Sequence, residues 1–116
     1  MPFTVSQRSD ATVVAIRGKF LGTLERDAFK SAIDDLKNGG VKGVVIDLSS
    51  TDFMDSTGIG LLISALTTIR GVDGDVVIAG LNTRIKNLFV MTRLLGPVFR
   101  DFETVDEAVA GLNVTA

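Results

Sequence analysis

Residues 52–60 have the types and spacing that could carry chemistry in this chain. Their sequence, Asp-Phe-Met-Asp-Ser-Thr-Gly-Ile-Gly, places two hydroxyls, Ser56 and Thr57, among carboxylates and glycines. A serine at the start of a helix can carry a phosphate with little distortion, because the free backbone N–H groups there favour added negative charge. One chemistry that this segment could support is serine phosphorylation.

The flanking residues place this segment between a strand and a helix. Residues 44–48 form an apolar, β-branched run typical of a buried strand, and residues 61–66 repeat apolar side chains at helical spacing. We therefore expect residues 52–60 to form a turn that ends in a helix N-terminus. The competing interpretation is that a hydroxyl only caps the helix, a common role for Ser and Thr. Both roles fit if Thr57 caps the helix and Ser56 faces solvent.

Two kinds of site built on aspartates fit the sequence less well. Asp47, at a strand end, could accept a phosphate as in response-regulator receivers, but the first two strands do not end in the acidic residues that such a site needs to hold Mg²⁺. Asp47 is better explained as a turn or capping residue. The pair Asp52 and Asp55 could act as acid and base, but it lacks a nucleophile and a ligand cage. Solvated turn carboxylates explain this pair equally well.

The glycines of the segment could suggest a dinucleotide-binding loop. That fingerprint needs a third glycine, and Ile63 stands in its place. We therefore expect a steric role, in which Gly58 and Gly60 let the start of the helix approach neighbouring backbone closely.

Composition narrows the classes of function. The chain has 116 residues, 46% of them hydrophobic, which fits one domain with its own core. Cysteine and histidine are absent, which excludes disulfides and thiolate metal sites and removes the commonest general base. A net charge of −2 argues against nucleic-acid binding. Neither a membrane span nor a secretory signal is visible, so we expect a cytoplasmic protein without a membrane partner. From the composition and the lack of a catalytic motif we expect no catalytic residues, bound metal or cofactor.

The apolar patterns predict alternating strands and helices. The expected strands are 3–7, 12–17 (ended by Gly18), 44–48, 75–79 and 98–99, the last after Gly96-Pro97. The expected helices run from an N-cap at Thr23 to about Lys37, from about Thr57 to Arg70, from Asn82 or Thr83 through Met91, and from a capping box at 104–107 through Ala110. The order indicates an α/β fold with a largely parallel sheet and an antiparallel N-terminal hairpin at its edge.

The segments 45–48 and 53–60 closely resemble the bacterial anti-sigma factor antagonists, which are single STAS domains. Residues 76–81, 85–92, 98–99 and 106–108 match the same family in order and spacing. The resemblance extends from about Val13 to Leu112, and it implies a single STAS domain over residues 1–116. Its fold would be a small mixed β-sheet with an N-terminal hairpin and helices packed on it.

The resemblance also implies a mechanism of partner switching. The unphosphorylated protein would bind an anti-sigma factor, which is a serine kinase of the histidine-kinase-like ATPase type, and so release a sigma factor or another client. The kinase would phosphorylate Ser56 and dissociate, and a metal-dependent serine phosphatase would restore the active form. ATP and Mg²⁺ belong to the kinase. The alternative is a STAS subunit that regulates or assembles with a transporter or larger signalling complex without phosphorylation.

Two positions depart from the family pattern. The usual aspartate after the second strand is replaced by Leu21, and the late helix ends Thr92-Arg93-Leu94 instead of Thr-Gly-Leu. We expect Leu21 to lie near Ser56, partly exposed, and to form an apolar rim with Met54, while Phe20 packs inward. The full set of expected partner-binding residues is Phe20, Leu21, Asp52, Met54, Asp55, Ser56, Thr57 and Gly58.

Overall fold

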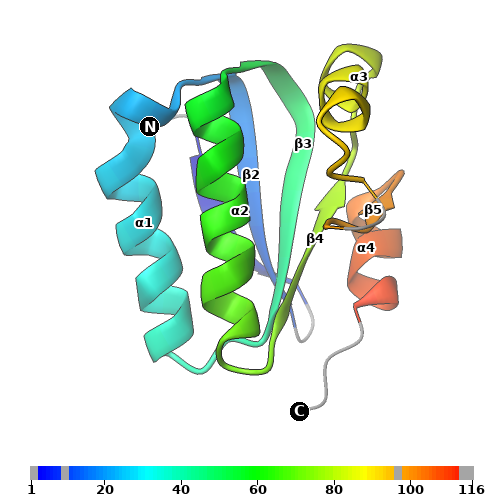
Figure 1. Ribbon diagram of the computed structural model, residues 1–116. Helices are drawn as coiled ribbons and strands as arrows, with labels where there is room; N and C mark the ends of the chain where they lie inside the picture. Colours follow the sequence, from blue (N-terminus) through cyan, green and yellow to red (C-terminus); the bar gives the residue numbers. More distant parts are fainter. Residues whose placement is uncertain (1–2, 9–10, 96–97, 113–116) are drawn as a thin grey trace.

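The computed structural model describes residues 3–8, 11–95 and 98–112, which form one sheet flanked by helices (Figure 1). The elements in chain order are β1 (Phe3–Arg8), β2 (Ala11–Phe20), α1 (Gly22–Asn38), β3 (Gly43–Met54), α2 (Ser56–Arg70), β4 (Asp75–Ala79), α3 (Thr83–Met91), β5 (Asp101–Phe102) and α4 (Val105–Gly111). No described helix is both long enough and apolar enough to cross a membrane.

The sheet has five strands in the order β1-β2-β3-β4-β5. β1 pairs with β2 in antiparallel fashion, and the remaining neighbours are parallel. The predicted fold class, a mixed sheet with an N-terminal hairpin and packed helices, is therefore confirmed. In this topology the carboxyl ends of β2, β3 and β4 lie at one edge of the sheet, where α1, α2 and α3 begin.

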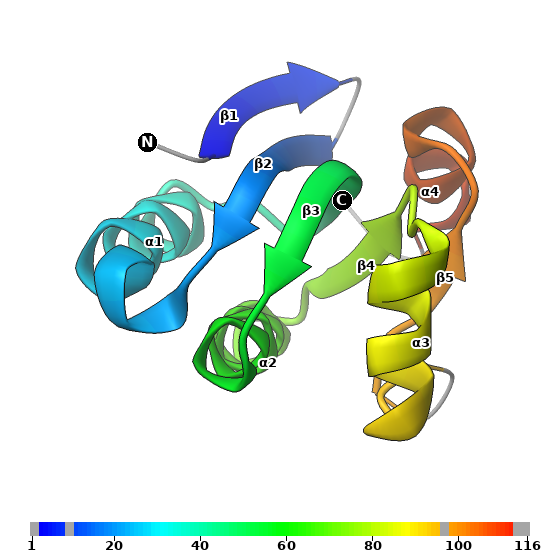
Figure 2. The same ribbon diagram turned by 90° about the horizontal axis from the view of Figure 1, so that it is seen from above.

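Helices cover both faces of the sheet (Figure 2). Val44 and Ile46 of β3 belong to the larger core cluster beneath α1, α2 and α3, whereas Val45 belongs to the cluster that includes Ala108 of α4. Adjacent residues of a strand point to opposite faces, so a strand covered on both sides is apolar throughout. This explains why Val44, Val45 and Ile46 are apolar in succession.

Two strands extend further than their sequence pattern predicts. β2 does not end at Gly18: this glycine has φ +71°, the register shifts there, and the strand continues to Phe20. β3 continues past Leu48 to Met54, where it pairs with Phe20. Within this extension the buried Thr51 has a hydrogen-bond partner: its hydroxyl donates a hydrogen bond of 2.8 Å to the Ile16 carbonyl.

The prediction of a strand at residues 98–99 is also wrong. β5 is Asp101–Phe102, and Phe99 forms only an isolated bridge with Leu95. Gly96-Pro97 lies outside the described residues. By contrast, the predicted limits of β4, the end of α2 at Arg70 and the start of α3 at Thr83 after Asn82 are confirmed. The predicted cap of α4 is present as well, because the Thr104 hydroxyl accepts from the Glu107 N–H.

Candidate functional site

Ser56 is the first residue of α2, and one residue, Asp55, separates it from the end of β3. The segment before the serine is thus a strand, not the turn that the sequence suggested. The Ser56 side chain is exposed, and its hydroxyl has no hydrogen-bond partner among the described residues. A hydroxyl that no neighbour engages is open to a reacting group from outside.

The Asp55 carboxylate caps two helices at once. Its Oδ1 accepts the Gly58 N–H of α2 at 2.6 Å and the Gly22 N–H of α1 at 3.0 Å, from a residue 33 positions away in the chain. Such caps satisfy helix N–H groups that have no partner within the helix. This overturns two expectations: Thr57 does not cap α2, and Thr23 does not cap α1, whose own N-cap residue, Leu21, makes no side-chain cap hydrogen bond.

Backbone lies directly on backbone between the two helix starts. A Cβ atom added to Gly22 would lie 2.3 Å from the Thr57 carbonyl carbon, and one added to Gly58 would lie 2.7 Å from the Phe20 carbonyl oxygen. The close approach predicted for Gly58 is therefore confirmed. The same prediction for Gly60 is wrong, because a Cβ there would meet no atom within 4 Å. The expected proximity of Leu21 to the serine is present, since its neighbour Gly22 touches Thr57.

The expected partner-binding residues divide by exposure. Asp52, Ser56 and Thr57 are exposed, Leu21 and Asp55 are partly exposed, and Phe20, Met54 and Gly58 are buried. Phe20 packs inward as expected, with its ring centroid 5.2 Å from that of Phe29. Met54 is only 3% exposed, so it does not form the predicted exposed rim with Leu21. The reason is that β3 reaches Met54 and turns its side chain into the core.

Large apolar residues at this end of the molecule are exposed, although the sequence patterns do not mark them as surface groups. Leu24 in the first turn of α1 is 74% exposed, Phe53 is 44% exposed, and Met91 of α3 is 81% exposed. The sequence held one signal for Leu24, which follows Leu21 by three residues and lies on the same side of a helix start. The sequence pattern predicts a turn at Phe53 and helix through Met91, and it does not predict that either side chain is exposed.

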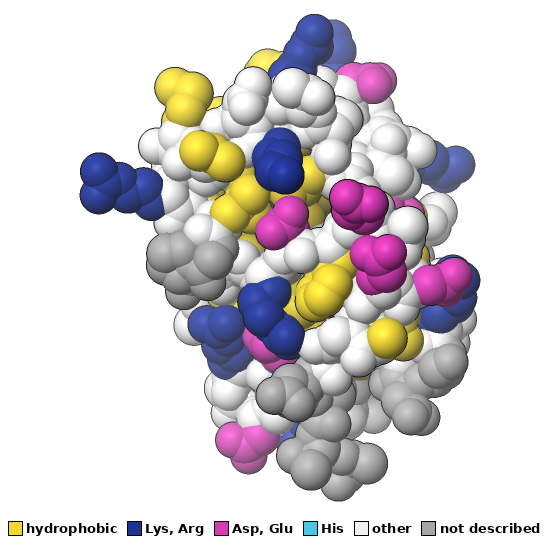
Figure 3. All heavy atoms as spheres, turned by 90° about the vertical axis from the view of Figure 1, so that its right-hand side faces the viewer, with side chains coloured by type: hydrophobic (Ala, Val, Ile, Leu, Met, Phe, Trp, Pro, Cys, Tyr) yellow, Lys and Arg dark blue, Asp and Glu magenta, His cyan; other side chains and the backbone are white. Residues whose placement is uncertain are grey.

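Two hollows lie on the α3 side of the serine. The first has a volume of about 240 Å³ and is lined mainly by apolar side chains, among them Phe53, Leu88 and Met91. The second is open and polar, lined by Asp52, Asn82, Thr83 and Arg84. The face of the molecule that carries α3 shows apolar side chains around a hollow in its upper part, with both basic and acidic side chains beside them (Figure 3).

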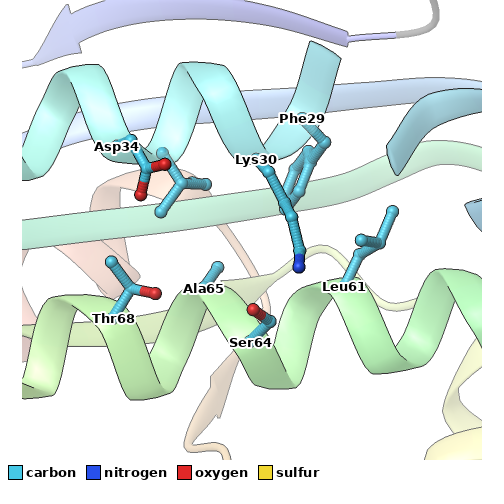
Figure 4. A pocket seen from close by; sticks show the side chains of 8 residues that line it. Phe29, Lys30, Asp34, Leu61, Ser64, Ala65 and Thr68 are labelled. Carbon is cyan, nitrogen blue, oxygen red and sulfur yellow. The ribbon is translucent and has the colours of Figure 1, made fainter. Parts of the chain in front are cut away.

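A smaller hollow lies between α1 and α2 (Figure 4). It measures about 130 Å³ and is lined by Phe29, Lys30, Asp34, Leu61 and Ser64, among others. Lys30 extends from α1 toward α2 there. The volume suits roughly four water molecules and is well below that of a typical ligand pocket. Across the described ranges, no group of three or more acidic, His or Cys side chains is arranged to hold a metal ion.

This fold and this helix start can now be compared with known proteins. The STAS domain family model matches residues 3–108, so the chain belongs to the STAS domain family. An anti-sigma-B factor antagonist of Staphylococcus aureus (strain NCTC 8325 / PS 47) is 29% identical over 65 residues, which are 56% of this chain. The match spans only 60% of that relative's length.

Solved structures share the architecture over nearly the whole chain. An anti-sigma factor antagonist from Mycobacterium paratuberculosis has a TM-score of 0.81 at 21% identity, covering 95% of this chain and 92% of its own. The Bacillus cell fate determinant SpoIIAA in its phosphorylated form has a TM-score of 0.67 at 22% identity, covering 93% and 96%. A sulfate transporter family protein from Wolinella succinogenes has a TM-score of 0.76 at 17% identity, covering 90% and 86%. Proteins with different descriptions thus share this fold.

Proposed function

We propose that this chain is an anti-sigma factor antagonist that works by partner switching. Unphosphorylated, it binds an anti-sigma factor that is also a serine kinase of the histidine-kinase-like ATPase type, and the client of that factor is released. The kinase then transfers a phosphoryl group from ATP: Ser56 Oγ forms the new bond to phosphorus, the bond to ADP breaks, and the hydroxyl proton leaves. The complex dissociates, and a metal-dependent phosphatase later hydrolyses the phosphoserine.

One observation carries this proposal: Ser56 presents an exposed hydroxyl, without a hydrogen-bond partner among the described residues, at the first position of α2. Asp55 is occupied by two helix caps, and the Thr57 side chain lies against α1, where its Cγ2 would be 2.5 Å from a Cβ on Gly22. The Thr57 hydroxyl also has no hydrogen-bond partner among the described residues, so what separates it from Ser56 is the position of its methyl group on the α1 side. Thr57 therefore has a packing role, in place of the capping role first expected.

The release step follows from charge. Phosphorylation adds about −1.5 to −2 charge at pH 7. The N-terminus of α2 favours this charge, whereas the carboxylates of Asp52 and Asp55 oppose it. A partner surface fitted to a neutral hydroxyl would have to desolvate the phosphate dianion, which weakens the complex without unfolding the domain.

The alternative, a STAS subunit of a transporter or larger complex that works without phosphorylation, has the same fold. The likeness to the Wolinella protein, at 17% identity, concerns the fold alone. The exposed, unengaged Ser56 favours the phosphorylation-controlled function, because a purely assembling surface has no need of a free hydroxyl at a helix start.

The experiment uses Ser56→Ala and Ser56→Glu as baits in extracts of the native cells, with Thr57→Ala as the matched control. Ser56→Ala and Thr57→Ala should retain an ATPase of the kinase type named above, and Ser56→Glu should not. The recovered kinase with Mg²⁺ and ATP should add one phosphate to wild type and to Thr57→Ala. Full phosphorylation of Ser56→Ala, or equal binding of all three baits, would contradict the proposal.

A further inference from the structure

We propose that the apolar hollow between β3 and α3 is a second docking element for the same partner. We call it the β3–α3 groove, defined by Phe53, Met54, Arg84, Ile85, Leu88 and Met91. It receives an apolar side chain from a segment of the kinase that also carries carboxylates. This inference rests on the proposed function, which it extends from the serine to a defined neighbouring surface.

The groove has the build of a docking surface. Ile85 is buried at 1% exposure and Met54 at 3%, so the floor is fixed by core packing. Phe53 and Met91 form the walls at 44% and 81% exposure, although both are large apolar side chains. One side of α3 faces the groove. It carries Arg84, Leu88 and Met91, which are spaced four and three residues apart. A concave apolar surface with a fixed floor and exposed walls has the shape to receive one apolar side chain.

Charge selects the occupant. Residues 81–95 contain Arg84, Lys86 and Arg93 and no acidic residue, although the chain as a whole has a net charge of −2. The ion pairs among the described residues involve Arg8, Arg70 and Arg100 and none of the three cations of the α3 region. Asp52 lines the neighbouring polar hollow together with Arg84, but the two side chains form no ion pair. Arg84 itself lines the groove. An apolar side chain flanked by carboxylates therefore complements this surface in both shape and charge.

Position connects the groove to the serine. Phe53 and Met54 are the last residues of β3, and Ser56 follows Met54 by two positions. α2 and α3 both begin at the edge of the sheet where β3 and β4 end, so a partner that reaches the Ser56 hydroxyl at this edge also meets the groove (Figure 1). The serine would supply the switch, and the groove would supply binding surface that phosphorylation does not alter.

Two pairs of substitutions on α3 test the groove. Met91→Glu places a carboxylate in the groove, whereas Val90→Glu places one on the adjacent residue, which is 55% exposed and does not line it. Arg84→Glu reverses the charge of a lining residue, and Lys86→Glu makes the same change outside the groove. All four side chains are exposed, so we expect every variant to keep the wild-type melting temperature.

Calorimetric titration of each variant with the kinase recovered by the Ser56→Ala bait gives the affinities. Met91→Glu and Arg84→Glu should weaken binding by about tenfold or more, and Val90→Glu and Lys86→Glu by less than about threefold. Equal losses within each pair would overturn the groove while leaving the serine switch intact. If no kinase distinguishes Ser56→Ala from Ser56→Glu, both proposals fail. Concentration-dependent dimers in light scattering, lost in Met91→Glu, would assign the groove to a second copy of this chain and overturn the proposal.

Discussion

The two sides of Ser56 are built in opposite ways. On the α1 side the backbones of Gly22 and Gly58 touch their neighbours so closely that neither position has room for a methyl group. On the α3 side a groove of about 240 Å³ remains open beside Phe53. The closed side fixes where the serine lies, and the open side leaves surface for a partner. Substitutions on the closed side should therefore change stability, and substitutions on the open side should change affinity.

The largest expected effect is that of Gly22→Ala on the closed side. The new methyl carbon would lie 2.3 Å from a backbone atom of Thr57, which no side-chain rotation can relieve. We expect the free energy of unfolding to fall by about 3 kcal/mol, the upper end of the usual cost of overpacking. Gly60→Ala is the control: its methyl group meets nothing within 4 Å, so helix propensity should raise stability by up to about 1 kcal/mol. Urea denaturation of both variants measures the difference, and equal stabilities would mean that the closed side is not close-packed.

Phosphoserine at position 56 should have the next largest effect. We expect it to lower the affinity for the kinase and to leave the stability of the fold unchanged. A loss of two decades in affinity for the kinase corresponds to about 2.7 kcal/mol. The fold should persist, because the phosphate projects from an exposed side chain and breaks no hydrogen bond of the described structure. Protein with phosphoserine incorporated during synthesis can be compared with wild type by calorimetric titration and by thermal melting. A melting temperature lowered by tens of degrees, or an unchanged affinity, would contradict this mechanism.

Asp55→Ala should show that the closed side depends on one carboxylate. Loss of an N-cap costs about 0.5–2 kcal/mol, and because Asp55 caps two helices we expect about 2 kcal/mol. Asp55→Asn retains an Oδ1 that can accept both N–H groups, and it should recover most of the loss. Urea denaturation compares the three proteins. If the asparagine variant were as unstable as the alanine variant, the negative charge would be the stabilising feature, and not the hydrogen-bond acceptor.

The contrast between the two sides also shows what the sequence could predict. The limits of β4, the Thr104 cap and a start of α3 at Asn82 or Thr83 are predicted correctly, because each depends on residues within a few positions of one another. The cap of α1 is not, because its acceptor, Asp55, lies 33 positions away. A local pattern favoured Thr23 there, and tertiary structure supplied a different residue.

The sequence also failed to predict the strand before Ser56 and the burial of Met54, for a related reason. The segment from Ser49 to Asp52 is polar and reads as a loop, yet it is strand, because the bulged end of β2 provides a partner as far as Phe20. That pairing sets the alternation which buries Met54 and exposes Phe53. The position of Ser56 at a helix start needed no such information, since the change from a strand pattern to a helix pattern marks it.

The smallest expected effect is that of Leu21→Asp, and it separates stability from affinity at a single position. Leu21 is the N-cap residue of α1, and its side chain makes no cap hydrogen bond. Aspartate is among the preferred N-cap residues, so it should offset the lost leucine packing and change the free energy of unfolding by no more than about 1 kcal/mol. Leu21 is partly exposed beside the serine, so the same change should weaken kinase binding by about 1 kcal/mol, or roughly fivefold.

Leu21→Asn provides the matched control, because asparagine caps as well as aspartate but adds no charge. If apolar contact with the partner is what Leu21 supplies, both variants should lose affinity to a similar degree. A loss confined to the aspartate would instead indicate repulsion by acidic groups of the kinase, the same groups that we propose to face Arg84 across the groove. Unchanged affinity in both would remove Leu21 from the interface, and a large loss of stability in both would place its side chain in the core. Thermal melts paired with calorimetric titration distinguish these results, and they show whether the partner's acidic surface extends from the open side of Ser56 to the closed one.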